Sequence, residues 1–207
     1  MARYTGPALK ICRRLKTKLP FKGERFFSVK FDKRLEVPPG AMPNRRLKKL
    51  SNYGIQLYEK QKLRKTYGVL ERQFVKYYEM ARKSAVTGEA LMQILETRLD
   101  NVVYRMGFGA SRRQARQWVT HKHFLVNGKM INIPSYLVKP GDVISVKENS
   151  KAKMHIQSNF TNAAARSLPE WVRVDGDKLE GTFVHIPSRD KIDLDVQENL
   201  VVEFYSR

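Results

Sequence analysis

The spacing of apolar residues changes near residue 123, from the repeat of a helix to the alternation of a strand. Before this point apolar residues recur at helical intervals, as at Leu70, Phe74 and Tyr77. After it, short alternating segments flank Asn127-Gly128, a dipeptide typical of a two-residue type I′ turn. The sequence therefore predicts an α+β fold, in which helices are followed by a small module of helices packed on a short antiparallel sheet.

Capping and turn residues set the expected limits of these elements. Ser51 and Ser111 can each cap the start of a helix, and Gly68 can close the first of the two. Helices are expected at 52–68, at 69–86, from 87 through 103 with a bend, after 111, and more weakly at 150–166. Strands are expected at 124–126, 129–133, 143–147, 170–175 and 179–185, and the alternating segment 200–207 is interpreted as a further short strand.

The charge of the chain is strongly positive and unevenly distributed. It carries 40 Lys and Arg against 20 Asp and Glu, a net charge of +20 over 207 residues. Residues 1–50 contain 15 basic and 3 acidic side chains, whereas residues 151–207 contain 8 and 9. Because so large a charge strains a compact state by self-repulsion, a polyanionic partner such as a nucleic acid is expected. A membrane is disfavoured, since no stretch approaches ~18 uncharged apolar residues and no N-terminal signal pattern is present.

Three arginines follow the cap at Ser111. Ser111 and Gln114 have the spacing of a capping box, and Arg112, Arg113 and Arg116 occupy the first turns of the helix. Cations at a helix N-terminus oppose the macrodipole, so a structural role does not explain them, whereas a docked polyanion does. On this interpretation, replacing all three with Gln should leave folding intact or slightly improve it.

The sequence offers few combinations of side chains that could carry out catalysis or bind a metal. The single cysteine, Cys12, excludes an internal disulfide framework. His121 and His123 do not converge on a metal at this spacing, so RNA contact or surface placement is favoured over ligation. The acids from Asp190 to Glu198 form either a solvated tail or a set of partners for the chain's own basic helix or for a neighbouring protein. No enzyme and no cofactor is expected.

Several segments resemble one known family. Residues 98–146, RLDNVVYRMGFGASRRQARQWVTHKHFLVNGKMINIPSYLVKPGDVISV, resemble the RNA-binding module named after bacterial small-subunit ribosomal protein four. Some tRNA synthetases and pseudouridine synthases share this module, but here the resemblance extends over nearly the whole chain. It includes MARYTGP (1–7), YGIQLYEKQKLRKTYGVLERQF (53–74), EGTF (180–183) and ENLVVEFYSR (198–207).

The resemblance implies a function and a domain order. Members of this family are structural constituents of the small ribosomal subunit and primary binders of the 5′ domain of its rRNA in the bacterial cytoplasm. They lie near the site where mRNA enters, contribute to decoding accuracy, and neighbour small-subunit proteins three and five. The implied domains are a basic N-terminal extension (1–45), a helical domain (46–97) completed by 178–207, and the inserted RNA-binding module (98–177). The alternative is a free-standing RNA-binding regulator or RNA-modification factor that uses the same module.

The extension departs from the pattern of many members of the family, which bind zinc through four cysteines. The corresponding positions here are Leu9, Cys12, Phe26 and Phe31, so a tetrahedral thiolate site cannot form. A small hydrophobic cluster is expected in place of the metal, and contacts with rRNA are expected to order the rest of the extension.

The candidate RNA-binding residues are basic, aromatic or amide side chains, which suit contacts with phosphate, ribose and exposed bases. Within the module they are Arg112, Arg113, Arg116, Lys122 and Asn127. In the helical domain they are Arg45, Arg46, Lys48, Lys49, Tyr53, Lys62, Arg64, Lys65 and Arg72. In the extension they are Arg3, Tyr4, Arg13, Arg14 and Lys22.

Overall fold

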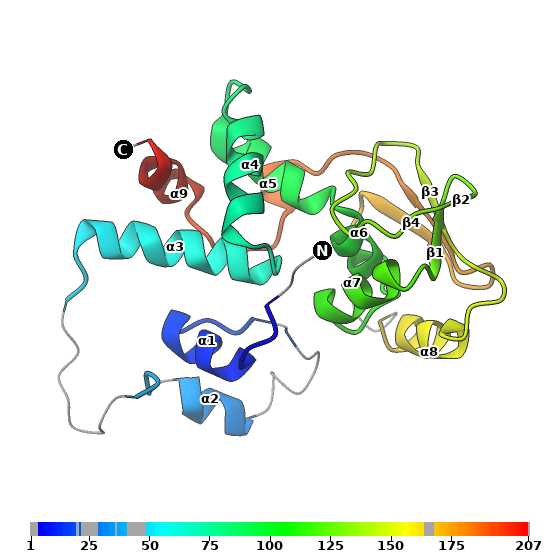
Figure 1. Cartoon of the computed structure of the whole chain (residues 1–207), viewed down its shortest axis with the longest axis horizontal. Helices are drawn as coiled ribbons and strands as arrows, with labels where there is room; N and C mark the ends of the chain where they lie inside the picture. The colour runs from blue at the N-terminus through cyan, green and yellow to red at the C-terminus, as the bar shows by residue number, and fades with distance from the viewer. Residues whose placement is uncertain are drawn as a thin grey trace. The chain divides into compact units, whose positions relative to one another are not determined.

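The computed structural model describes residues 4–19, 21, 29–35, 37–40, 49–163 and 168–206. The chain forms two units, one built on residues 91–193 and the other on residues 2–90 together with 194–207. The sequence placed the corresponding boundaries at 97–98 and 177–178. Figure 1 gives the course of the chain by colour. The mixture of helices and an antiparallel sheet confirms the expected α+β class.

The unit that contains both chain ends is helical. Its elements within the described residues are α1 (Ala8–Leu15), α2 (Val29–Leu35), α3 (Asn52–Thr66), α4 (Glu71–Ala81) and α9 (Glu198–Tyr205). Helix α5 (Thr87–Glu96) spans the boundary at residue 91.

The ends of α3 follow the local signals in the sequence. The Ser51 hydroxyl accepts a hydrogen bond from the Gly54 N–H at 3.2 Å, which caps the helix start. At the other end Gly68 has φ of +65°, and the N–H groups of Gly68 and Val69 donate to the carbonyls of Lys65 and Arg64 at 3.1 Å each. This is a Schellman turn, in which glycine adopts the left-handed conformation without steric cost.

The C-terminal segment is a helix that packs on α3, as Figure 1 shows. The Gln56 side chain donates to Glu203 at 2.8 Å, and the Gln197 N–H donates to Glu59 at 3.0 Å. The expectation of a strand at 200–207 is therefore wrong, because contacts with α3 decide between helix and strand for so short an apolar run. The implied packing of the C-terminal segment on the helices near 50–90 is confirmed for α9 on α3.

A carboxylate joins three elements of this unit. Glu71, at the start of α4, accepts from Lys60 at 2.8 Å and from the Tyr205 hydroxyl at 2.7 Å, and pairs with Arg64 at 3.0 Å. Burial alone would raise the pKa of Glu71, but the hydrogen bonds from Lys60 and Tyr205 and the nearby positive charges hold that pKa below its usual value. Lys60 itself is only 5% exposed, and its ammonium lies 4.3 Å from the centre of the Phe204 ring. This cluster fixes α9 and α4 to α3.

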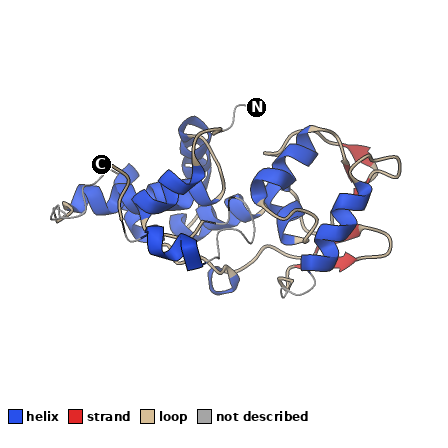
Figure 2. Cartoon of the chain, turned by 90° about the horizontal axis from the view of Figure 1, so that it is seen from below, coloured by secondary structure: helices blue, strands red, loops and turns tan. Residues whose placement is uncertain are grey.

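The second unit is built on a five-stranded antiparallel sheet of order β2-β1-β3-β5-β4, whose strands are red in Figure 2. The strands are β1 (Phe124–Val126), β2 (Lys129–Met130), β3 (Val143–Val146), β4 (Val172–Asp175) and β5 (Glu180–Phe183). Asn127 and Gly128, between β1 and β2, have φ of +49° and +74°, which confirms the type I′ turn. Since β5 lies between β3 and β4, residues 180–183 belong to this unit rather than to the helical one.

Helices cover the apolar face of this sheet. They are α6 (Leu99–Arg105), α7 (Arg112–Thr120) and α8 (Lys153–Ala163). Phe108, in the turn between α6 and α7, lies 5.9 Å from Phe124 of β1 and 6.1 Å from Phe160 of α8, measured between ring centres. The core of the unit is therefore continuous from the sheet through this turn to α8.

The N-terminal extension contains more structure than its charge indicated. Cys12 of α1 and Phe31 of α2 are buried in one small apolar cluster, and Leu9 packs against it. The hydrophobic cluster expected in place of zinc is thus confirmed for these three positions, while Phe26 lies outside the described residues. The expectation of an extension with little periodicity missed α1 and α2.

Glu71 should make the stability of the protein dependent on pH. Because its pKa is lower in the folded than in the unfolded chain, its contribution is fully present above about pH 4.5 and is lost as pH falls through the folded pKa. We expect the free energy of unfolding to fall less steeply between about pH 5 and 3 in Glu71→Gln than in the wild type. Exposed Glu79 on the same helix is the matched control, and Glu79→Gln should keep the wild-type slope. Equal slopes in all three proteins would contradict this role of Glu71.

Candidate RNA-binding surface

The arginine helix α7 begins as the capping residues indicated. The Ser111 hydroxyl accepts from the Gln114 N–H at 3.3 Å, and the Gln114 side chain accepts from the Ala110 N–H at 2.9 Å. The second bond reaches one residue further back than in the usual capping box. Together these bonds satisfy two backbone donors at the helix start and fix the position of Arg112 and the arginines after it.

Arg112 and Arg116 have partners within the protein. Arg112 donates to the Asn101 side chain at 2.7 Å and lies 4.6 Å from the centre of the Tyr104 ring. Arg116 pairs with Asp100 at 3.1 Å. Their side chains are only 10% and 14% exposed. The inference that no structural role explains these cations is therefore wrong for Arg112 and Arg116, because buried acids compensate the unfavourable helix dipole.

The two acids beside these arginines, Glu96 and Asp100, lie in the interior. Glu96 is fully buried and accepts from Asn101 at 2.6 Å and from Arg105 at 3.0 and 2.7 Å. Asp100 is 3% exposed and accepts two hydrogen bonds from Arg98, at 3.0 and 2.6 Å. The two carboxylates thereby connect α5, α6 and α7.

We call this set the buried charge network. Its members are Glu96, Arg98, Asp100, Asn101, Arg105, Arg112 and Arg116. Four guanidinium groups face two carboxylates, so the network keeps an excess of positive charge. Arg98 and Arg105 were not among the candidates predicted from the sequence. The signal was available for Arg98, because Glu96 and Asp100 lie two residues before and two residues after it.

The other candidates in the sheet unit differ in their surroundings. Arg113 is half-buried, and Lys122 is exposed at the end of α7. The Asn127 side chain donates to Asp142 at 2.8 Å and accepts from the Val143 N–H at 2.9 Å. Asn127 therefore fastens the β1–β2 turn to β3, whether or not it also contacts RNA.

Two candidates on α3 are held by acids. Lys62 lies 3.1 Å from Asp195 and 3.8 Å from Glu59, and its side chain is 14% exposed. Arg64 pairs with Glu71 and also donates to Gln61 at 2.7 Å. The pairing of Lys62 with Asp195 confirms, for that one acid, the alternative in which the acidic run contacts the chain's own basic helix.

The remaining candidates of the helical unit lie nearer the surface. Lys49 and Arg72 are exposed, and Tyr53 is 50% exposed with its ring 5.5 Å from that of Phe204. The Lys65 ammonium lies 4.2 Å from the centre of the Tyr4 ring, a cation–π contact that joins α3 to the N-terminal segment.

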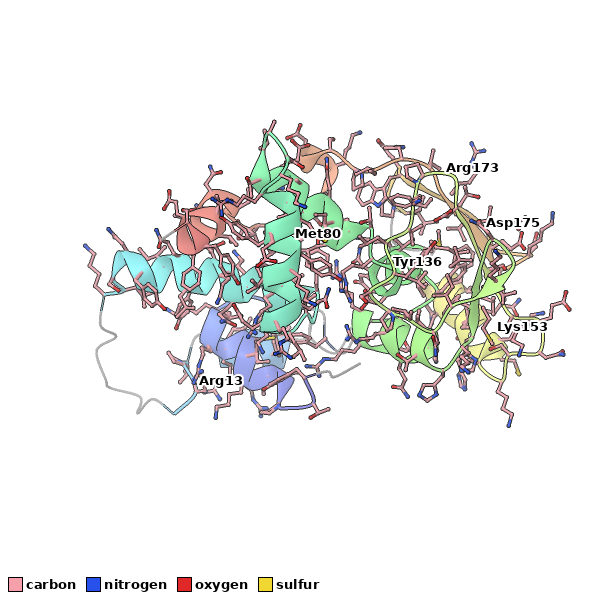
Figure 3. The ribbon with its side chains drawn as sticks, turned by 45° about the horizontal axis from the view of Figure 1, so that its top comes forward. Arg13, Met80, Tyr136, Lys153, Arg173 and Asp175 are labelled. Atoms are coloured by element: carbon pink, nitrogen blue, oxygen red, sulfur yellow. The ribbon has the colours of Figure 1, made fainter. Side chains whose placement is uncertain are left out.

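Of the candidate arginines in the extension that the structure describes, Arg13 is anchored and Arg14 is exposed. Arg13, labelled on α1 in Figure 3, donates to the carbonyls of Val37 and Pro38 at 2.8 and 3.3 Å, whereas Arg14 is exposed. The candidates that lie outside the described residues are Arg3, Lys22, Arg45, Arg46 and Lys48.

Two other classes of site are absent from the described residues. Within residues 4–19, 21, 29–35, 37–40, 49–163 and 168–206, no group of three or more His, Cys, Asp or Glu side chains could hold a metal ion. No helix in the same ranges is long and apolar enough to cross a membrane.

Comparisons with known proteins define the class of the chain. Residues 3–96 match the family described as "Ribosomal protein S4/S9 N-terminal domain", and residues 97–144 match the S4 domain. These two domains in this order are those of a ribosomal protein with an RNA-binding S4 domain, not those of an enzyme.

Full-length relatives identify the family. The chain is 55% identical to "Small ribosomal subunit protein uS4A" of Symbiobacterium thermophilum and 54% identical to "Small ribosomal subunit protein uS4" of Acetivibrio thermocellus. It is 53% identical to the protein of that name from Hahella chejuensis. Each alignment covers 100% of both proteins. The chain belongs to the small ribosomal subunit protein uS4 family.

Removing an arginine from the buried charge network should destabilise the protein. Arg112→Gln and Arg116→Gln should each lower the free energy of unfolding by about 1–3 kcal/mol, because each leaves a buried polar partner without one of its hydrogen bonds. Chemical denaturation measures this change. The control is Arg173→Gln on the edge strand β4, an exposed arginine labelled in Figure 3, which should change stability by less than about 0.5 kcal/mol. A free energy of unfolding equal to that of the wild type in both α7 variants would support the original hypothesis that these arginines serve only to bind RNA.

Proposed function

We propose that this protein is a structural component of the small ribosomal subunit in the cytoplasm and binds the 5′ domain of the subunit's rRNA. The observation that carries the proposal is the division of its cations into two groups. Arg112, Arg116 and Lys62 are held by acids of the protein itself, whereas Arg14, Lys49, Arg72 and Lys122 are exposed. Membership of the uS4 family supplies the ribosomal context.

Recognition of this kind depends mainly on phosphate and ribose. The deep groove of A-form RNA hides its base edges, so a protein that binds helices reads their shape through backbone contacts. Lys and Arg side chains at the surface supply these contacts, and Tyr53, half-exposed on α3, is suited to stack on an unpaired base. The candidate residues predicted from the sequence, including those outside the described residues, remain part of this proposal. For Arg112, Arg116, Lys62 and Arg64, contact with RNA would come in addition to their contacts with acids of the protein.

The protein neighbours and the contribution to decoding belong to the same proposal. Small-subunit proteins three and five and the incoming mRNA are the partners that the family resemblance implies. Residues 151–207, with 8 basic and 9 acidic side chains, are the least suited to RNA and the best suited to a basic protein neighbour.

The RNA affinity should depend steeply on salt. If about ten or more phosphates are neutralised, the logarithm of the association constant should fall with the logarithm of the salt concentration at a slope on the order of −7 to −9. Filter binding to a transcript of the rRNA 5′ domain measures this slope. A slope near −2 would mean that the basic surface is not the main binding surface.

A second measurement separates a ribosomal component from an RNA-binding regulator with the same module. Small subunits purified at moderate salt should contain this chain in a one-to-one ratio with the other proteins of the subunit, as quantitative mass spectrometry can establish. Recovery far below that ratio, with the protein bound instead to another RNA, would favour the regulator.

A further inference from the structure

Helix α7 ends in a turn that places three basic residues together. The Lys122 N–H donates to the Val119 carbonyl at 3.0 Å, and the His123 N–H donates to the Trp118 carbonyl at 3.1 Å. These two bonds define a Schellman turn with His121 as the C-cap residue after Thr120. The turn fixes His121, Lys122 and His123 at one corner, where α7 meets β1.

The residue in the left-handed position of this turn is unusual. Lys122 has φ of +64°, a conformation that costs conformational free energy for any side chain with a Cβ. The equivalent turn at the end of α3 has nearly the same φ, +65°, but uses Gly68, for which this cost is absent. A strained residue that the fold could replace with glycine is a reason to look for a function of its side chain.

The two histidines are held beside each other. The His121 and His123 rings are stacked, with their centres 6.2 Å apart. His123 Nδ1 is 2.9 Å from the Ser150 hydroxyl, which leaves Nε2 as the nitrogen able to donate to a ligand. His121 is exposed, and His123 is half-buried.

The charged groups around the histidines are positive. His121 and Lys122 come from the end of α7, and Lys147 comes from the end of β3, where its N–H donates to the His123 carbonyl at 2.9 Å. Burial, followed by the charges of His121 and Lys147, lowers the pKa of His123. Exposed Glu148 and Lys151 follow in the next loop, and neither is among the groups that shift this pKa. The corner is therefore an electropositive site in which imidazoles repel their neighbours once they are protonated.

We propose that His121, Lys122, His123 and Lys147 bind a phosphate group of the RNA backbone, and that binding is accompanied by uptake of a proton on a histidine. The proposal rests on the RNA-binding function proposed above and adds a site to it. A phosphate anion between these groups would replace their mutual repulsion with attraction and would favour the imidazolium form.

This site makes RNA affinity depend on pH with a definite sign. Since bound phosphate raises the histidine pKa, the complex holds more protons than the free protein. Affinity therefore rises as the pH falls toward the pKa of the histidine in the free protein, which lies below 6.5 for His123. The stability of the free fold changes in the opposite direction. His123 has a lowered folded pKa, so the unfolded chain takes up the proton first and the folded state loses stability as pH falls. Loss of folded protein therefore cannot mimic the expected gain in affinity.

The chain contains four histidines, His121, His123, His155 and His185. Two of them lie in the proposed site and two lie elsewhere, so each pair can be replaced in a matched variant. Wild-type affinity for the 5′-domain transcript should rise about 3- to 10-fold from pH 7.5 to 6.0 at constant salt, as expected for uptake of about one proton. His121→Gln/His123→Gln should remove this rise, so that its affinity no longer differs between pH 7.5 and pH 6.0. The control His155→Gln/His185→Gln, which replaces two exposed histidines elsewhere, should keep the rise.

The outcomes separate this site from the proposed function. Absence of specific binding at any pH would overturn the RNA-binding function itself. Specific binding that does not vary with pH in the wild type, or that varies equally in the His121→Gln/His123→Gln protein, would overturn only the histidine site.

Lys122→Gly provides a second test that does not depend on histidine titration. It removes both the strain at φ +64° and the positive charge. We expect a midpoint of thermal unfolding at or above that of the wild type, together with a 3- to 10-fold loss of RNA affinity and a salt slope smaller in magnitude by about 1. Unchanged affinity and slope in a stably folded Lys122→Gly protein would exclude Lys122 from the site.

Discussion

Two buried carboxylates organise the sheet unit. Glu96 and Asp100 lie where α5, α6 and α7 meet. Asn101 and Arg105 donate to Glu96, and Arg98 and Arg116 pair with Asp100. A buried carboxylate without such partners would carry a large desolvation cost, and so would buried arginines without the acids. The position of α7 on α6, and therefore of the turn that leads into β1, depends on both sets being present.

The helical unit uses the same principle in smaller form. Glu71 holds Lys60, Arg64 and the Tyr205 hydroxyl, so that a cation, an aromatic ring and the C-terminal helix are fixed by one carboxylate. Burial and the hydrogen bond to Glu71 raise the pKa of Tyr205 far above its usual value, which keeps its hydroxyl protonated as a donor. In a chain of net charge +20, the few acids thus decide which cations are structural and which stay at the surface.

Local signals in the sequence predicted the local structure well. The cap at Ser111, the turn at Asn127-Gly128 and the glycine closing α3 were found because each depends on neighbouring residues only. The segment 200–207 was misassigned because five apolar or aromatic residues in so short a run fit a strand as well as a helix, and contacts with α3 decide between them.

Contacts between side chains that are distant in the sequence could not be predicted from it. Nothing in a single chain indicates that Tyr205 meets Glu71, or that Arg112 meets Asn101. For that reason the arginines of α7 were assigned entirely to RNA, although Arg112 and Arg116 already pair with groups of the interior. Both Lys122 and Arg116 are basic, so the sequence treats them alike. The structure shows that Lys122 is exposed, whereas Arg116 is mostly buried and paired with Asp100.

Lysine reactivity in the free and RNA-bound protein tests this division of cations most directly. Acetylation of lysines, read by mass spectrometry, reports on each ammonium group separately. Lys60, buried against Glu71 and Phe204, should be unreactive in both states, and exposed Lys178, in the β4–β5 turn, should be reactive in both. Lys49, Lys122 and Lys147 should be reactive in the free protein and protected in the complex with the rRNA 5′ domain. Equal reactivity of these three lysines in both states would contradict the assignment of the exposed cations to RNA.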